Sequence, residues 1–222
     1  MRRRQLIALI AAAAATPGVA LAGDQRIQLA KAFPMLEQYL GVPAAERSRF
    51  YLAYRATRDK RPAADAHGAI VRPGGGAVPL AFDRSGFVTR LPSLAELKGD
   101  ADLVMAGAPF KLQPEARCAI APSARIDPGE LAAALAQANA AIAKIAGPMA
   151  ALIPKLTCAF FPDAGGGHAL FADGRQSPLA VFASPVVGPV PFFEPAKAAG
   201  AKAIVLARAP SRILLGGHPK TA

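Results

Sequence analysis

The chain has 222 residues, with 26 Lys and Arg against 15 Asp and Glu, and a formal net charge of +11. This length suits one domain or two small ones and excludes a large multidomain protein. A charged fraction of 18% beside abundant apolar residues excludes a chain that is disordered by default.

Residues 1–22 have the pattern of a secretory signal peptide. Three arginines at positions 2–4 precede an apolar stretch, and Ala20-Leu21-Ala22 matches a small-x-small cleavage site. Cleavage after Ala22 starts the mature protein at Gly23, in the periplasm or outside the cell. The apolar stretch is shorter than the roughly 20 residues that span a bilayer, so no transmembrane span is expected in the mature chain. Arg3-Arg4 also fits a loose twin-arginine pattern, which leaves Sec and twin-arginine export both open.

The positive charge bears on possible partners. Loss of the three leader arginines lowers the net charge from +11 to +8. The remaining arginines are scattered and have no interleaved aromatic residues, so nucleic acid is not an expected partner. An anionic envelope component, such as lipopolysaccharide or phospholipid headgroups, or another envelope protein suits this charge better. The alternative is a basic protein that is simply soluble.

The first half of the mature chain, residues 23–122, predicts a helix followed by strands. Asp24 is a candidate N-cap for a helix with Leu29, Leu36 and Leu40 on one face, and Pro34 predicts a kink or restart within it. Runs of β-branched and aromatic residues between turn residues predict strands at 49–57, 68–72, 77–82, 87–91, 102–105 and 116–121. Glycine-containing turns at 73–76 and 83–86 favour antiparallel hairpins.

The second half, residues 123–222, repeats this order. Asp127 as N-cap, Pro128 in the first turn and Glu130 in a capping box predict a helix that ends at Gly147. Strands are predicted at 156–161, 169–171, 178–182, 203–207 and 212–215. The stretch 185–195 is too rich in proline for a central strand, so it predicts a loop over the sheet, or a surface patch of Val190, Phe192 and Phe193.

The two halves also match each other in sequence. Residues 69–82 parallel 169–182, and residues 103–112 parallel 204–213, with Ala-Pro at the same place in the second pair. This spacing predicts two tandem related modules, 23–122 and 123–222, each with an N-terminal helix and about five strands, and leaves open whether they have separate cores or share one. The expected fold class is α+β with a mostly antiparallel sheet.

The chain has two cysteines, Cys118 and Cys158, both in strand-like contexts. In an oxidising compartment such thiols tend to pair, so a structural disulfide between them is predicted. Two separate core thiols are the alternative. A redox-active pair is not expected, because no Cys-x-x-Cys spacing is present.

One loop has a catalytic appearance. Gly165, Gly166 and Gly167 could present N–H groups to an oxyanion, and Asp163 and His168 flank them as candidate catalytic residues. The order differs from that of known oxyanion loops and no nucleophile elbow is present, so a simple hairpin approach is the competing interpretation.

A metal site is a second possibility, if the halves face each other and bring Asp65 and His67 to Asp163 and His168. His218 lies in a polar tail, where it is expected to be solvated. No nucleotide-binding motif is present, and no cofactor is expected.

These features favour an exported, non-enzymatic protein that binds an envelope component or another protein. Two alternatives stay open: a hydrolase that uses Asp163, the glycine loop and His168, or a carrier of a small molecule or lipid with a pocket between the modules.

Overall fold

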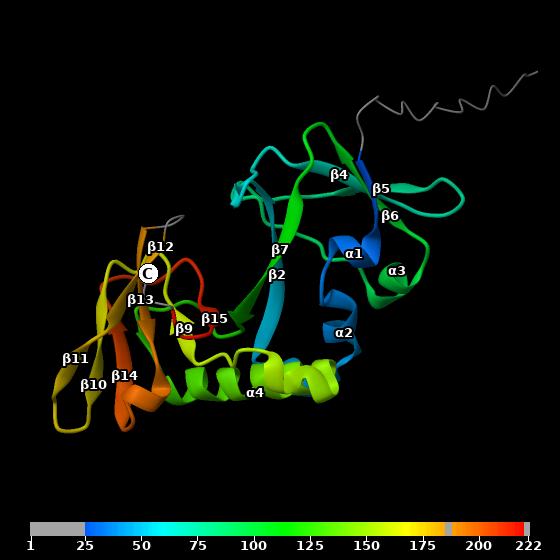
Figure 1. Ribbon diagram of the computed structural model, residues 1–222. Helices are drawn as coiled ribbons and strands as arrows, with labels where there is room; N and C mark the ends of the chain where they lie inside the picture. The colour runs from blue at the N-terminus through cyan, green and yellow to red at the C-terminus, as the bar shows by residue number, and fades with distance from the viewer. Residues whose placement is uncertain (1–24, 185–187, 220–222) are drawn as a thin grey trace, which may run out of the picture.

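The computed structural model describes residues 25–184 and 188–219. The predicted signal peptide, its cleavage site at Ala22 and Gly23, the candidate cap Asp24 and residues 185–187 lie outside the described residues. Within them the chain is a mixture of helices and mostly antiparallel sheets, as predicted (Figure 1).

The chain begins with a strand where a helix is predicted. Residues Gln25–Gln28 form β1, and the helix is divided into α1 (Leu29–Ala32) and α2 (Leu36–Gly41). The break falls at Pro34, which confirms the predicted restart, because proline cannot donate to the preceding turn. Tyr54 donates a hydrogen bond of 2.6 Å to the Pro34 carbonyl and thereby ties the break to the core.

Two four-stranded sheets lie at opposite ends of the molecule (Figure 1). The first has the order β1-β6-β4-β5, with β4 (His67–Val71), β5 (Ala77–Leu80) and β6 (Asp102–Ala106), and α3 (Leu94–Lys98) follows the β5 hairpin. The second has the order β11-β10-β14-β8, with β8 (Arg125–Ile126), β10 (Gly167–Phe171), β11 (Gln176–Pro178) and β14 (Ala201–Leu206).

A seven-stranded sheet joins the two halves, with the order β12-β13-β9-β15-β7-β2-β3. The first half supplies β2 (Phe50–Arg58), β3 (Arg61–Pro62) and β7 (Lys111–Cys118). The second half supplies β9 (Cys158–Phe160), β12 (Ala180–Ser184), β13 (Gly188–Phe193) and β15 (Leu214–Gly216). The C-terminal strand β15 lies between β7 and β9 and so joins the two halves directly.

The predicted second helix is present as α4 (Pro128–Ala146). Asp127 is its N-cap, but its carboxylate accepts from the Gly129 N–H and no capping box with Glu130 forms. The helix runs beneath the central sheet from one half to the other (Figure 1). The short helices are η1 (Ala44–Arg47), η2 (Gly147–Leu152) and η3 (Pro195–Lys197).

One predicted strand is absent, and one predicted loop contains a strand. Residues 87–91 form only isolated bridges, from Phe87 to Arg55 and from Val88 to Phe82. Conversely, β13 is an interior strand of the central sheet although it contains Pro189 and Pro191. The Pro191 carbonyl accepts a hydrogen bond from the Phe161 N–H, so the Pro191 nitrogen also faces β9. The missing N–H therefore costs no hydrogen bond to β12, and β9 pairs with β13 at only two positions.

The predicted surface patch in this stretch is also wrong, because Val190, Phe192 and Phe193 are all buried.

The predicted disulfide is wrong as well, and Cys118 and Cys158 are both buried free thiols. Arg117 and Phe160 both lie opposite Leu214, so these residues share one face of the sheet. Side chains alternate along a strand, so Cys158 points to that face while Cys118 points to the other. Their strands are also separated by β15, about 10 Å in all, which exceeds the span of a disulfide.

Candidate functional site

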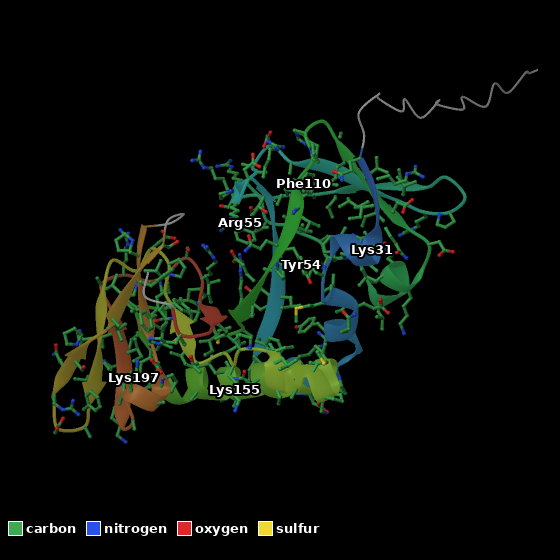
Figure 2. The ribbon with its side chains drawn as sticks, in the orientation of Figure 1. Lys31, Tyr54, Arg55, Phe110, Lys155 and Lys197 are labelled. Carbon is green, nitrogen blue, oxygen red and sulfur yellow. The ribbon has the colours of Figure 1, made fainter. Side chains whose placement is uncertain are left out.

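The two faces of the central sheet differ sharply in burial. On one face, Phe50, Leu52 and Tyr54 of β2, with Ala159 of β9 and Leu215 of β15, are buried. The opposite face carries Arg55, Glu115, Arg117, Phe160 and Leu214, none of which is fully buried. Figure 2 shows Arg55 and Tyr54 leaving β2 on opposite sides. The second face is therefore accessible to a ligand around these residues, whereas Cys158, Val190 and Phe192 on the same face are buried.

The central groove lies on this face, where β7 and β15 diverge. The two strands pair at a single position, Leu214 opposite Arg117, and then separate. The resulting cavity has a volume of about 320 Å³. Its apolar walls include Phe160, Phe182, Val190 and Leu214, and Glu115 is its charged residue. This volume is at the lower end of the range for small-molecule sites, and its apolar lining with few polar groups is typical of them.

An arginine cluster stands beside Glu115. Arg117 donates two hydrogen bonds, of 3.3 and 3.1 Å, to Oε2 of Glu115, and Nε of Arg212 lies 3.4 Å from the same oxygen. Nη2 of Arg55 lies 3.8 Å from Oε1. All three guanidinium groups lie over the ring of Phe87. Their Cζ atoms lie 3.9 Å (Arg117), 4.1 Å (Arg55) and 5.5 Å (Arg212) from the ring centroid. The cluster thus contains three cations, one carboxylate and an aromatic platform.

The charges of this cluster are not balanced. Counting ion pairs within 4.0 Å, one carboxylate faces three guanidinium groups, so these four side chains carry a net charge of +2, and they are only 12% to 19% exposed. Nε of Arg55 and Nε of Arg212 are buried and have no hydrogen-bond partner among the described residues. Burial lowers the pKa of Arg55, and the charges of Arg212 and Arg117 lower it further, whereas Glu115 and, less strongly, Asp83 raise it. An added anion at this place would relieve the remaining repulsion among the three guanidinium groups.

A second cluster on the same face was not predicted from the sequence. Cys158, Glu194 and His218 each place one potential ligand atom within 4.8 Å of the other two. His218 Nδ1 lies 3.1 Å from Glu194 Oε2 and 4.0 Å from Cys158 Sγ. His218 is half-exposed, which agrees with the expectation that it is solvated, but its ring also packs edge-on against Phe192 at 5.9 Å. These residues are distant in sequence and meet because β9 and β15 are neighbours in the sheet. No sequence spacing therefore predicts this cluster.

The environment gives these groups different protonation tendencies. Burial raises the pKa of the Cys158 thiol, although the Thr157 hydroxyl, 3.6 Å from Sγ, opposes this. The Glu194 carboxylate accepts a hydrogen bond of 2.9 Å from Lys197, which lowers its pKa, and the charge of His218 adds to this effect. Glu194 is therefore held as a carboxylate beside a neutral thiol.

The metal ligands predicted from the sequence lie in different sheets. Asp65 pairs with Arg58 at 3.0 Å, and His67 lies on β4 in the first four-stranded sheet. His168 lies on β10 in the second, and the Asp163 carbonyl accepts from Arg208. Across residues 25–184 and 188–219, these four side chains form no metal-binding group.

The glycine loop has a conformational explanation. Asp163, Gly165 and Gly166 have positive φ, at 67°, 74° and 137°. A Cβ on Gly167 would lie 2.6 Å from the Val205 carbonyl oxygen, so glycine is required where β10 meets β14. Within the described part of the chain, no hydrogen bond joins His168 to Asp163, and the loop shows no catalytic pairing.

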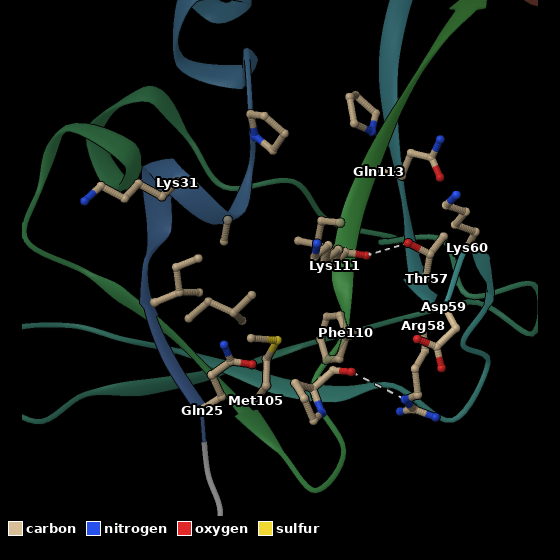
Figure 3. A pocket seen from close by; sticks show the side chains of 17 residues that line it. Gln25, Lys31, Thr57, Arg58, Asp59, Lys60, Met105, Phe110, Lys111 and Gln113 are labelled. Carbon is tan, nitrogen blue, oxygen red and sulfur yellow. Dashed lines mark hydrogen bonds between the residues drawn. The ribbon is translucent and has the colours of Figure 1, made fainter.

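A larger cavity, of about 940 Å³, lies between β1, β6 and the ribbon of β2 and β7 (Figure 3). Met105 and Phe110 form part of its apolar floor, and Lys31, Lys60 and Lys111 stand around it. Figure 3 shows Lys31 pointing away from Met105 and Phe110. Arg58 at its edge is already bound by Asp65 and by the carbonyl groups of Ala108 and Pro109. Its cations are thus exposed or already paired, which distinguishes it from the central groove.

Comparison of the sequence with models of known protein families, with curated proteins and with solved structures finds no match. Among the described residues, no helix has the length and apolarity needed to cross a bilayer.

Proposed function

We propose that this chain is an exported, non-enzymatic protein that binds a small anionic amphiphile in the central groove. The ligand class is a carboxylate or a similar anion with a short apolar chain. The observation that carries the proposal is the arginine cluster, in which three guanidinium groups meet one carboxylate beside an apolar cavity. The sequence pattern of residues 1–22 supports the exported location.

Charge and shape support the same ligand. Guanidinium groups bind carboxylates and phosphates with paired hydrogen bonds, and their strength rises where water is partly excluded. The groove walls of Phe160, Phe182, Val190 and Leu214 suit a hydrocarbon chain. An anion held at Arg55, Arg117 and Arg212 would have its apolar part directed toward the groove.

The position of the groove fits the carrier alternative. Pro114, Glu115 and Ala116 come from the first half of the chain, and the other lining residues come from the second half. Ligand sites often lie at such junctions.

The further proposal of two related modules gains support from strand order. The two four-stranded sheets have the orders β1-β6-β4-β5 and β8-β14-β10-β11. In each sheet the strand that comes first in the chain lies at one edge and is followed by the fourth, the second and the third. The pair β2 and β7 likewise has a counterpart in the pair β9 and β15. The groove would then lie at the junction of the two modules.

Binding of octanoate, with 1-octanol as the uncharged match, tests the function. The full protein is secreted from a bacterial host, its mass is checked for a start at Gly23, and both ligands are titrated by calorimetry. Octanoate is expected to bind at least about tenfold more tightly than octanol, because a charge-assisted hydrogen bond contributes about 1.5–3 kcal/mol. Arg117→Gln should remove most of this preference.

Matched variants separate charge from folding. Arg175→Gln is the control, because Arg175 also stacks on a phenylalanine, Phe171 at 3.7 Å, and pairs with an aspartate, but makes no ion pair with Glu115. It should leave octanoate binding unchanged. Glu115→Gln raises the charge of the cluster and should not weaken octanoate. Equal binding of the two ligands, or octanoate binding unaffected by Arg117→Gln, would refute the proposal.

A further inference from the structure

We infer that Cys158, Glu194 and His218 form a binding site for a zinc-class divalent metal ion, with three protein ligands and one open position. This site is independent of the arginine cluster, although both lie on the same face of the central sheet. The inference rests on the convergence of a thiol, a carboxylate and an imidazole on one point.

The distances are close to those of a tetrahedral zinc centre. With bonds of about 2.3 Å to sulfur and about 2.0 Å to nitrogen and oxygen, the sulfur and nitrogen ligands lie about 3.5 Å apart and nitrogen and oxygen about 3.3 Å apart. The observed separations are 4.0 Å for Cys158 Sγ to His218 Nδ1 and 3.1 Å for Nδ1 to Glu194 Oε2. Shifts of a few tenths of an ångström therefore suffice for the two separations from His218, which is at the half-exposed edge where such a shift is easy. The third pair, Cys158 Sγ and the Glu194 carboxylate, lies within 4.8 Å and approaches by up to about 1.3 Å to reach the tetrahedral separation of about 3.5 Å.

The orientation of the imidazole argues against a nucleophile triad. In a catalytic triad one ring nitrogen faces the nucleophile and the other is held by the acid. Here Cys158 Sγ and Glu194 Oε2 both face the same nitrogen, Nδ1 of His218. Such an arrangement cannot relay a proton from the thiol to the far side of the ring, but it does place three ligand atoms around a common point.

The surroundings support a metal centre. Lys197 donates to Glu194 at 2.9 Å and orients the carboxylate, as outer partners of metal ligands commonly do. The ring of Phe192 packs against His218 and partly screens the site from water. Cys158 is fully buried, whereas Glu194 is partly exposed and His218 is half-exposed.

The ligand types define the metal. Sulfur, nitrogen and oxygen donors together suit zinc, and also cobalt(II) as its spectroscopic substitute, whereas magnesium and calcium take oxygen ligands. On binding, the Cys158 thiol releases its proton to the solvent as the sulfur–metal bond forms. The Nδ1 proton of His218 is lost to the solvent, the neutral ring keeps its proton on Nε2, and Nδ1 and the Glu194 carboxylate bond to the metal in place of each other. No change of oxidation state is involved.

Cobalt(II) and zinc titrations of the untagged, chelator-treated full chain test the inference. One equivalent of cobalt is expected to produce the charge-transfer absorption of a thiolate ligand, and zinc should abolish it. Cys158→Ser should remove this absorption, and His218→Ala should weaken zinc binding more than about 100-fold, since even the loss of an outer partner costs about 10–100-fold.

Two control variants keep the result interpretable. Cys118→Ser removes the other buried thiol, which points to the opposite face, and His168→Ala removes a histidine outside the cluster. Both should bind cobalt like the unmodified chain. Zinc should also raise the unfolding temperature of the unmodified chain but not that of His218→Ala. An absent thiolate band, or zinc affinity unchanged in both His218→Ala and Glu194→Gln, overturns the inference.

Discussion

Glu96 shows how one carboxylate can join three segments of the chain. Its Oε2 accepts from the Ser93 N–H at 2.8 Å and forms the capping box of α3. Its Oε1 accepts from Arg72 at 2.7 Å and from Arg90 at 3.1 Å. The Ser93 N–H and the Arg72 guanidinium are the main causes that lower the pKa of Glu96 to about 2. The side chain is only 11% exposed, so solvent screens these contacts weakly.

This shift predicts an acid-sensitive contribution to stability. The folded-state pKa of Glu96 is about 2, below the ordinary value of 4.5. The stabilisation is therefore fully present above pH 4.5 and is lost as the pH falls toward about 2. Glu96→Gln should therefore lower the free energy of unfolding by about 1 kcal/mol near neutral pH. In urea denaturation the two proteins should converge as the pH falls through this window. A difference that is independent of pH would contradict the electrostatic explanation.

Single residues also show where sequence reasoning reaches its limit. The predicted export to an oxidising compartment favours a disulfide between Cys118 and Cys158, but the face to which each points depends on the register with β15. His218 lies far from Cys158 and Glu194 in sequence, and only the pairing of β15 with β9 brings them together. Local patterns contain no information on such long-range register.

At the level of the element, α4 was predictable because its signals are local. Asp127 and Gly147 define its ends, and the apolar spacing defines its face. The apolar spacing predicts a buried face of Leu131, Leu135, Ala138, Ile142 and Ile145. The observed face differs in detail, since Ala134 and Ala141 are buried whereas Ile142 and Ile145 are only partly so. Strand β13 was missed because its prolines are tolerated only through the shortness of β9, which is a property of its neighbour.

The small residues of α4 predict a close approach to the sheet. Ala134 and Ala138 are fully buried on the side that packs against the core. Ala134→Leu should overfill this interface and lower the free energy of unfolding by about 1–3 kcal/mol. Ala136→Leu, at an exposed position of the same helix, is the control and should change it by no more than about 0.5 kcal/mol. Chemical denaturation followed by circular dichroism measures both, and equal effects would refute close packing at Ala134.

At the level of the whole molecule, the sequence predicts the class and most strands, but not their assembly. The alternation of apolar residues in 49–57 predicts β2, and the glycine turn at 73–76 predicts the hairpin of β4 and β5. The pairing of β15 with both β7 and β9 could not be predicted, because β15 is short and its partners are far away in sequence. The groove and both clusters depend on this pairing, which explains why the sequence did not reveal them.

One hydrophobic cluster contains residues from both halves, including Leu29 and Tyr54 from the first and Leu131 and Ile213 from the second. Polar groups of α4 add further connections. Gln137 accepts from the Arg49 N–H at 2.7 Å, and Asn139 exchanges two hydrogen bonds with Leu156. The helix is therefore bonded to both halves of the chain.

These connections predict that the two halves unfold together. Separating residues 23–122 from 123–222 would leave β7 and β15 without each other and expose the apolar face of α4. The whole chain should therefore show one calorimetric transition, with equal calorimetric and van't Hoff enthalpies. Each half expressed alone should lack a cooperative transition. Two separate transitions in the full chain, or a half that melts cooperatively by itself, would mean that the central sheet is a contact between independent domains and not a shared core.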